Sequence, residues 1–142
     1  MRVKLIIIVL LFVLLPGATA VCLAESDCEN ENEEAGFPAL EKFHTVMAKM
    51  WHKHLPDKDY DAIRKSSTEL NQRMEDLKKA ELPKSLSGKA DAVKEKIGKL
   101  GDAVDALSKA SKGKDDEMLG KTVVTVHEAY HALVMVIYEK SK

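Results

Sequence analysis

The chain has 142 residues, and its 22 basic and 23 acidic side chains give a formal net charge of −1 with histidine neutral. This balance argues against a broad basic surface of the kind that binds nucleic acid. The sequence has no glycine-rich phosphate loop, no cofactor fingerprint and no nucleophile at a recognisable spacing from a base. We therefore do not expect an enzyme.

Residues 1–20 have the organisation of a signal peptide. Arg2 and Lys4 precede an apolar run over residues 5–15, and residues 18–20 read Ala-Thr-Ala, the small-x-small form that signal peptidase cuts. The run is too short to span a membrane as a helix, so no stable membrane insertion is expected after cleavage. Cleavage would change the formal net charge from −1 to −3 by removing Arg2 and Lys4. The expected product is a single domain in the periplasm or outside the cell.

Both cysteines, Cys22 and Cys28, fall near the start of this mature chain. In an oxidising compartment their spacing favours a small local disulfide loop, and a thiol metal site is the alternative. A lipoprotein with Cys22 acylated is a weaker interpretation, because Val21 is large where that signal requires a small residue.

Residues 21–36 form an acidic lead. Between Glu25 and Glu34 there are six acidic residues, no basic residue and no large apolar side chain. Such a segment buries too little apolar surface to offset its chain entropy, so we expect it to be disordered. Its carboxylates would either be solvated or collect cations loosely.

In residues 37–142, apolar side chains recur at spacings of three and four, which predicts four helices. The expected helices run from Pro38 to His54, from Asp57 or Asp59 to the Leu82-Pro83 pair, from Leu86 to Leu107, and from Asp115 or Asp116 to the end of the chain. No long stretch after Phe37 alternates with the period of a strand. Short connections between four helices favour an all-α fold, an antiparallel up-down-up-down four-helix bundle.

The predicted fourth helix carries two histidines four residues apart, His127 and His131. This spacing puts both on one helix face, and neutral imidazole is the commonest protein ligand for transition metals. In an antiparallel bundle, a rise of about 1.5 Å per residue places His44 of the first helix at the height of His127. The sequence therefore predicts a copper or zinc site formed by His44, His127 and His131.

Residues 127–131, His-Glu-Ala-Tyr-His, also satisfy the zinc-protease pattern H-E-x-x-H. Such proteases need a third protein ligand further along the chain. The only candidate, Glu139, lies in the same predicted helix and cannot fold back. We therefore interpret the match as a pair of histidines with a chance glutamate between them.

The first helix offers further soft donors in Met47, Met50, His52 and His54. Thioether and imidazole together suit copper, particularly Cu(I), so these residues are candidates for an additional metal cluster. The alternative is that the methionines fill the core and the two histidines interact with the helix dipole.

The segment from Thr122 to Tyr130 resembles part of the c-prime cytochromes, which are exported four-helix bundles. That superfamily carries C-x-x-C-H-x-x-[YF] on its last helix, and the motif's histidine and aromatic residue align with His127 and Tyr130. Val123 and Val126 stand in place of the two haem-binding cysteines. The resemblance implies that covalent haem attachment has been lost and that His127 occupies the place of the axial iron ligand.

The related b-type bundle cytochromes hold haem without thioether bonds, which implies that His44 or Met47 could serve with His127. His131 has no role in either haem scheme, whereas a bare metal ion uses both histidines of the fourth helix. Metal-ion binding is therefore our first hypothesis and haem-based electron transfer the second. A structural or partner-binding bundle is the third, and a homodimer is compatible with all of them.

Overall fold

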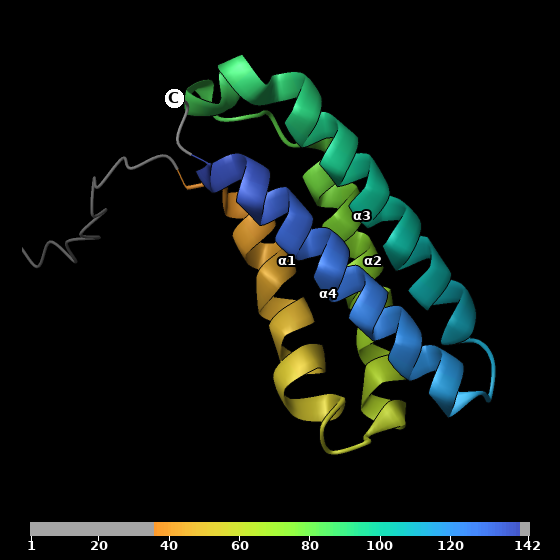
Figure 1. The fold of residues 1–142 in the computed structure, drawn as a ribbon. Coiled ribbons are helices and arrows are strands. Elements are labelled where there is room, and N and C mark those ends of the chain that lie inside the picture. Colours follow the sequence, from red (N-terminus) through yellow and green to blue (C-terminus); the bar gives the residue numbers. More distant parts are fainter. Residues whose placement is uncertain (1–35, 140–142) are drawn as a thin grey trace, which may run out of the picture. The chain divides into compact units, whose positions relative to one another are not determined.

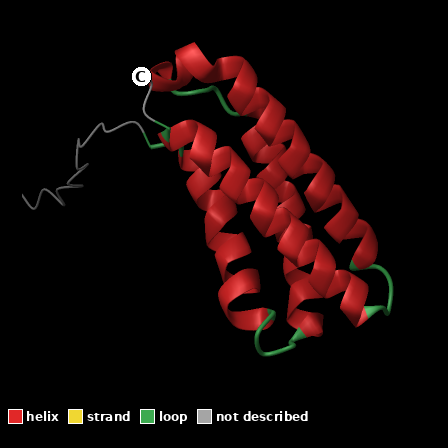
Figure 2. Ribbon diagram, viewed as in Figure 1, coloured by secondary structure: helices red, strands yellow, loops and turns green. Residues whose placement is uncertain are grey.

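The computed structural model describes residues 36–139, which lie within one compact unit. Within these residues all regular structure is helical and no strand occurs (Figure 2). The helices are α1 (Pro38–Lys49), the π-helix η1 (Met50–His54), α2 (Tyr60–Lys79), the 3-10 helix η2 (Lys84–Lys89), α3 (Ala90–Ala110) and α4 (Asp116–Tyr138). The prediction of an all-α fold with four main helices is confirmed.

The predicted signal peptide, the acidic lead to residue 35 and both cysteines, Cys22 and Cys28, lie outside the described residues. Among the helices that are described, none combines the length and the apolar character needed to cross a membrane.

Two aspartates fix the starts of α2 and α4. The Asp59 carboxylate accepts a hydrogen bond of 3.0 Å from the backbone N–H of Ala62. The Asp115 carboxylate accepts one of 2.9 Å from the backbone N–H of Met118. Each carboxylate satisfies an N–H that has no partner inside its helix, which is why both helices begin where the sequence predicts.

The first predicted helix changes its winding before it ends. It is α-helical to Lys49 and continues as the π-helix η1. In this segment the N–H of Leu55 donates a hydrogen bond to the carbonyl of Met50, and the N–H of Asp59 donates one to the carbonyl of His54. A π-turn contains one residue more than an α-turn. After Met50, the α-helical spacing of apolar residues, three and four apart, therefore no longer predicts which side chains face the core.

The third predicted helix also differs at its start. Leu86 lies in the 3-10 helix η2, and regular α-helix begins only at Ala90. Leu86 is nevertheless buried, because the tighter winding of η2 still turns it inward. The apolar pattern thus identified the buried residue but not the type of helix.

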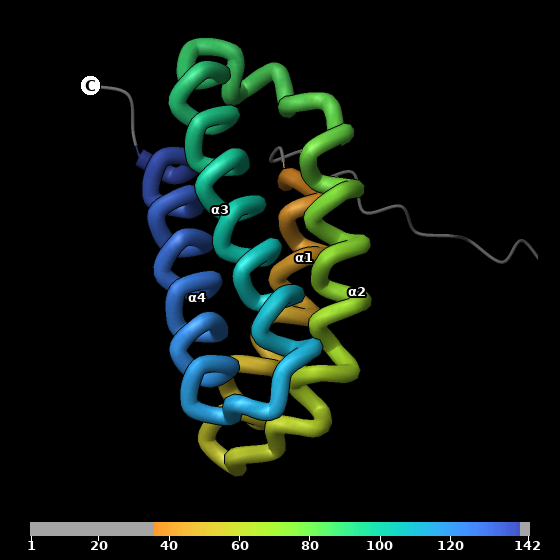
Figure 3. Tube along the Cα trace, turned by 90° about the vertical axis from the view of Figure 1, so that its right-hand side faces the viewer, coloured from red at the N-terminus to blue at the C-terminus, as the bar shows by residue number. Residues whose placement is uncertain are grey.

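The helices lie side by side in Figures 1 and 3. α1 packs on α2, α2 on α3 and, most extensively, α3 on α4, which also meets η1. Their apolar faces enclose one core whose fully buried large side chains are Phe43, Met50, Ile63, Leu70, Met74, Leu77, Leu100, Leu107, Leu119 and Leu133. The core holds α4 against the other helices, and α4 carries His127 and His131.

Arg64 on α2 joins that helix to the connection between α3 and α4. Its guanidinium donates to the Asp116 carboxylate at 2.6 Å and to the Gly113 carbonyl at 3.2 Å. The Arg64 side chain is mostly buried, whereas Asp116 is half exposed and its ion pair is partly screened by solvent.

We expect Arg64→Ala to lower the free energy of unfolding by about 1 kcal/mol, since it removes two charge-assisted bonds in a partly screened setting. Urea denaturation with an unchanged m-value measures the loss. Arg73→Ala is the matched control, because Arg73 pairs only within α2, with Glu69 and Asp76. Its expected cost is below about 0.5 kcal/mol. Equal losses in the two variants would mean that the Arg64 contacts contribute nothing particular.

Candidate functional site

Aromatic and imidazole rings form the contact between the first and last helices. His44 of α1 stacks on Tyr130 of α4 with ring centroids 5.0 Å apart and planes inclined by 5°. Trp51 of η1 stacks on His127 with centroids 3.8 Å apart and the same inclination. Phe43 contributes a third, more distant ring contact with Tyr130, at 6.3 Å. Tight, near-parallel stacking therefore fixes the orientation of both His44 and His127.

The two histidines of α4 lie next to each other. The ring centroids of His127 and His131 are 4.5 Å apart, with the ring planes inclined by 67°. His127 is partly buried beneath Trp51, whereas His131 is exposed. A metal ion lies about 2.0–2.1 Å from a ligating imidazole nitrogen. The two rings are adjacent on one helix face, which is the arrangement that two ligands of a single ion need.

The third predicted ligand, His44, is not opposite His127. It faces Tyr130, about one turn further along α4, and Trp51 occupies the position opposite His127. Within residues 36–139 no three or more His, Cys, Asp or Glu side chains are grouped so that they could hold a metal ion. The structure thus brings together two of the three predicted ligands and places the third nearby.

The pKa of His127 is lowered from its usual value of 6.5. Burial of the ring is the main cause, followed by the positive charges that His131 and His52 carry when protonated, and His44 adds a smaller effect. Glu128 acts in the opposite direction without reversing the shift. His127 is therefore in its neutral, metal-binding form at neutral pH, and His52 and His44 both lie within electrostatic range of it.

Tyr130 also has a perturbed hydroxyl. Burial raises its pKa above the usual 10.0, and the negative charge that Tyr138 carries when ionised and that of Glu41 add to this effect. Tyr130 therefore stays a neutral phenol and serves the site as a flat surface for His44.

The additional donors of the first helix divide into two groups. Met47 and Met50 are core residues, with 2% and 1% of their surfaces exposed, which agrees with the packing interpretation. His52 is exposed, whereas His54 is partly buried with its Nδ1 at 3.9 Å from the Asp59 carboxylate. No hydrogen-bond partner of that buried Nδ1 is found among the described residues. Of the four donors, His52 alone is both accessible and within electrostatic range of His127.

Val123 and Val126 are also core residues, with 2% and 1% of their surfaces exposed. Their side chains are thus packed among the helices. Comparison with protein-family models, with curated proteins and with solved structures finds no match for this chain.

The lowered pKa of His127 predicts its behaviour in a titration of the metal-free protein followed by NMR of the histidine ring protons. We expect a midpoint below 6.5, and a return toward 6.5 in Trp51→Leu, because that change exposes the ring to water. A midpoint at or above 6.5 in the wild-type protein would contradict the role of burial.

The same shift has a consequence for stability. Between the native and unfolded pKa values, the unfolded state binds more protons at this position than the native state does. The contribution of His127 to stability is therefore complete above pH 6.5 and is lost as the pH falls through its native pKa.

Proposed function

We propose that this chain is an exported, non-enzymatic protein that binds a transition-metal ion, copper or zinc, through histidines between α1–η1 and α4. The observation that carries the proposal is the adjacency of His127 and His131, whose ring centroids are 4.5 Å apart on one helix. Imidazole suits both metals. The lowered pKa of His127 favours the unprotonated form that coordination requires.

His127 and His131 supply two ligands in this proposal, and an exposed histidine from the facing segment supplies the third. His52 and His44 are the candidates. The side chain of His52 is exposed, whereas His44 would have to leave its stack on Tyr130 to coordinate the ion. Both histidines lie within electrostatic range of His127. Water would fill a remaining position, as it does in open zinc sites.

A bare ion accounts for these side chains better than haem does. Both histidines of α4 acquire a role in binding an ion, whereas a porphyrin axial position needs one. A porphyrin also requires a flat space beside its ligand, but Trp51 covers one face of His127 and the valines at 123 and 126 belong to the packed core.

The four helices are proposed to form an antiparallel up-down-up-down bundle, and the ring contacts support this order. His44 stacks on Tyr130. Trp51, which comes later in the chain, stacks on His127, which precedes Tyr130. Figure 1 supports the same order, since the α1–α2 and α3–α4 connections lie at one end and the α2–α3 connection at the other.

The helix order predicts specific proton contacts in solution. Nuclear Overhauser effects should join the ring protons of His44 to those of Tyr130, and the ring protons of Trp51 to those of His127. In a parallel arrangement of α1 and α4 the pairing would be reversed, with His44 near His127, and that result would overturn the proposed bundle.

The metal site predicts how ligand removal changes affinity. We expect His127→Ala and His131→Ala each to weaken binding of Cu(II), Cu(I) and Zn(II) by more than about tenfold. Removing a residue that only hydrogen-bonds to a ligand already costs about tenfold or more in metal affinity, and removing the ligand itself should cost at least as much. Isothermal titration calorimetry measures the affinities. His54→Ala is the control and should bind as the wild type does.

Trp51 provides a second readout, because it is the single tryptophan of the chain and contacts His127. Cu(II) bound at His127 should quench its fluorescence, whereas Zn(II) should not. Comparing His52→Ala with His44→Ala then identifies the third ligand. Unchanged affinity in both α4 variants would refute the site.

A further inference from the structure

The last turns of α4 expose large apolar side chains that the candidate metal site does not use. Met135 has 72% of its surface exposed and Tyr138 has 69%. The two residues are three apart on the helix and therefore lie on the same face. Exposed apolar patches on soluble domains commonly mark interaction surfaces.

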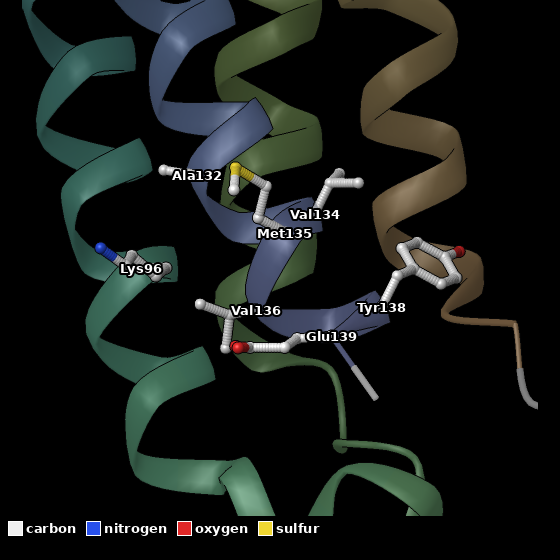
Figure 4. Close-up of a pocket in the computed structure, with 7 residues that line it drawn as sticks. All are labelled: Lys96, Ala132, Val134, Met135, Val136, Tyr138 and Glu139. Carbon is white, nitrogen blue, oxygen red and sulfur yellow. The ribbon is translucent and has the colours of Figure 1, made fainter. Parts of the chain in front are cut away.

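A groove of about 630 Å³ lies beside Met135, where α4 meets α3 (Figure 4). The lining includes the apolar residues Ala132 and Val136 of α4. Two charged residues also border the groove, Lys96 from α3 and Glu139 after the end of α4. Neither forms an ion pair with another residue of the described chain. The groove thus combines an apolar lining with one positive and one negative charge.

The position of the groove is fixed by Lys89, which precedes α3. Its ammonium group donates to the carbonyls of Val136 at 3.0 Å, Ile137 at 3.2 Å and Glu139. The carbonyls of Val136 and Ile137 belong to the last turn of α4, and that of Glu139 follows directly after it, so none of them has a partner within the helix. Lys89 therefore holds the end of α4 on α3, and a preformed groove loses less conformational entropy when it is occupied.

We propose that this groove is the interface between two copies of the chain, with the two α4 helices antiparallel and crossing at Met135 about a twofold axis. An interface of this kind uses the same patch on both subunits, so the patch must be complementary to itself. An apolar centre with one charge of each sign meets that requirement. The flexible Met135 side chain of each copy would fill the groove of the other.

The twofold axis also determines which charges meet. When two α4 helices cross antiparallel at Met135, residues that follow Met135 in one copy lie level with residues that precede it in the other. Glu139 of one copy is therefore level with the turn of the other copy that contains Ala132. Because the twofold axis is perpendicular to both helices, the side of α4 that faces α3 lies on the same side of the contact in both copies. Glu139 therefore approaches the side of α4 that faces α3, where Lys96 lies beside the stretch from Ala132 to Val136 (Figure 4). The symmetry forms this Lys96–Glu139 pair twice.

The mixed charge also favours a second copy over other occupants. A nucleic acid, an anionic lipid surface or an acidic peptide would be attracted by Lys96 but repelled by Glu139. A second copy pairs both charges at once. The small side chain of Ala132 allows the two helix backbones to approach closely.

The test is sedimentation velocity of the purified protein over a range of concentrations, in buffer with a chelator so that no metal contributes. We expect a concentration-dependent dimer. Lys96→Glu and Glu139→Lys, each of which places like charges opposite one another, should raise the dimer dissociation constant by at least about tenfold, and so should Met135→Asp. The double variant Lys96→Glu/Glu139→Lys should restore association, because it exchanges the two charges and keeps them complementary.

Met118→Asp is the matched control, because Met118 is also exposed, at 52%, but lies in the first turn of α4. Its dissociation constant should equal that of the wild type, and circular dichroism should show unchanged helix content in every variant. A monomeric wild-type protein would overturn the proposal, as would a double variant no better than the single ones. The experiment uses no metal, so its outcome is independent of the proposed metal site.

Discussion

The stacking of Trp51 on His127 is the contact on which the candidate site depends. It joins the segment after α1 to the middle of α4 with ring centroids 3.8 Å apart. Burial is the main cause of the lowered pKa of His127, and Trp51 covers one face of that ring. The contact that packs two helices together thus also keeps an imidazole neutral and fixes its orientation, both of which favour coordination.

Much of the helical structure follows from local features of the sequence. The apolar spacing of three and four identifies the faces that form the core, and the aspartates at 59 and 115 locate the starts of two helices through hydrogen bonds to N–H groups three residues away. The adjacency of His127 and His131 follows in the same way, because both lie in one regular helix. Each of these features depends only on residues within a turn or two of one another.

Features that depend on contacts between helices are harder to predict from the sequence than these local ones. A count of residues placed His44 level with His127, but the structure sets it against Tyr130, because the count assumes straight α-helices and cannot include the π-helix η1 or the offset between α1 and α4. The sequence also left two roles open for Met47 and Met50. Their burial supports packing in the core, which spacing alone could not distinguish from coordination.

α4 carries three different surfaces in one helix. One side enters the core, a second presents His127 to η1, and the exposed ridge carries His131 and, one turn later, Met135. The proposed metal site and the proposed interface between copies are therefore neighbours on α4. If metal binding changes the rotamer of His131, it alters the surface beside Met135. Any effect of the ion on association must then be matched by an equal effect of association on affinity for the ion, because coupled binding free energies are reciprocal.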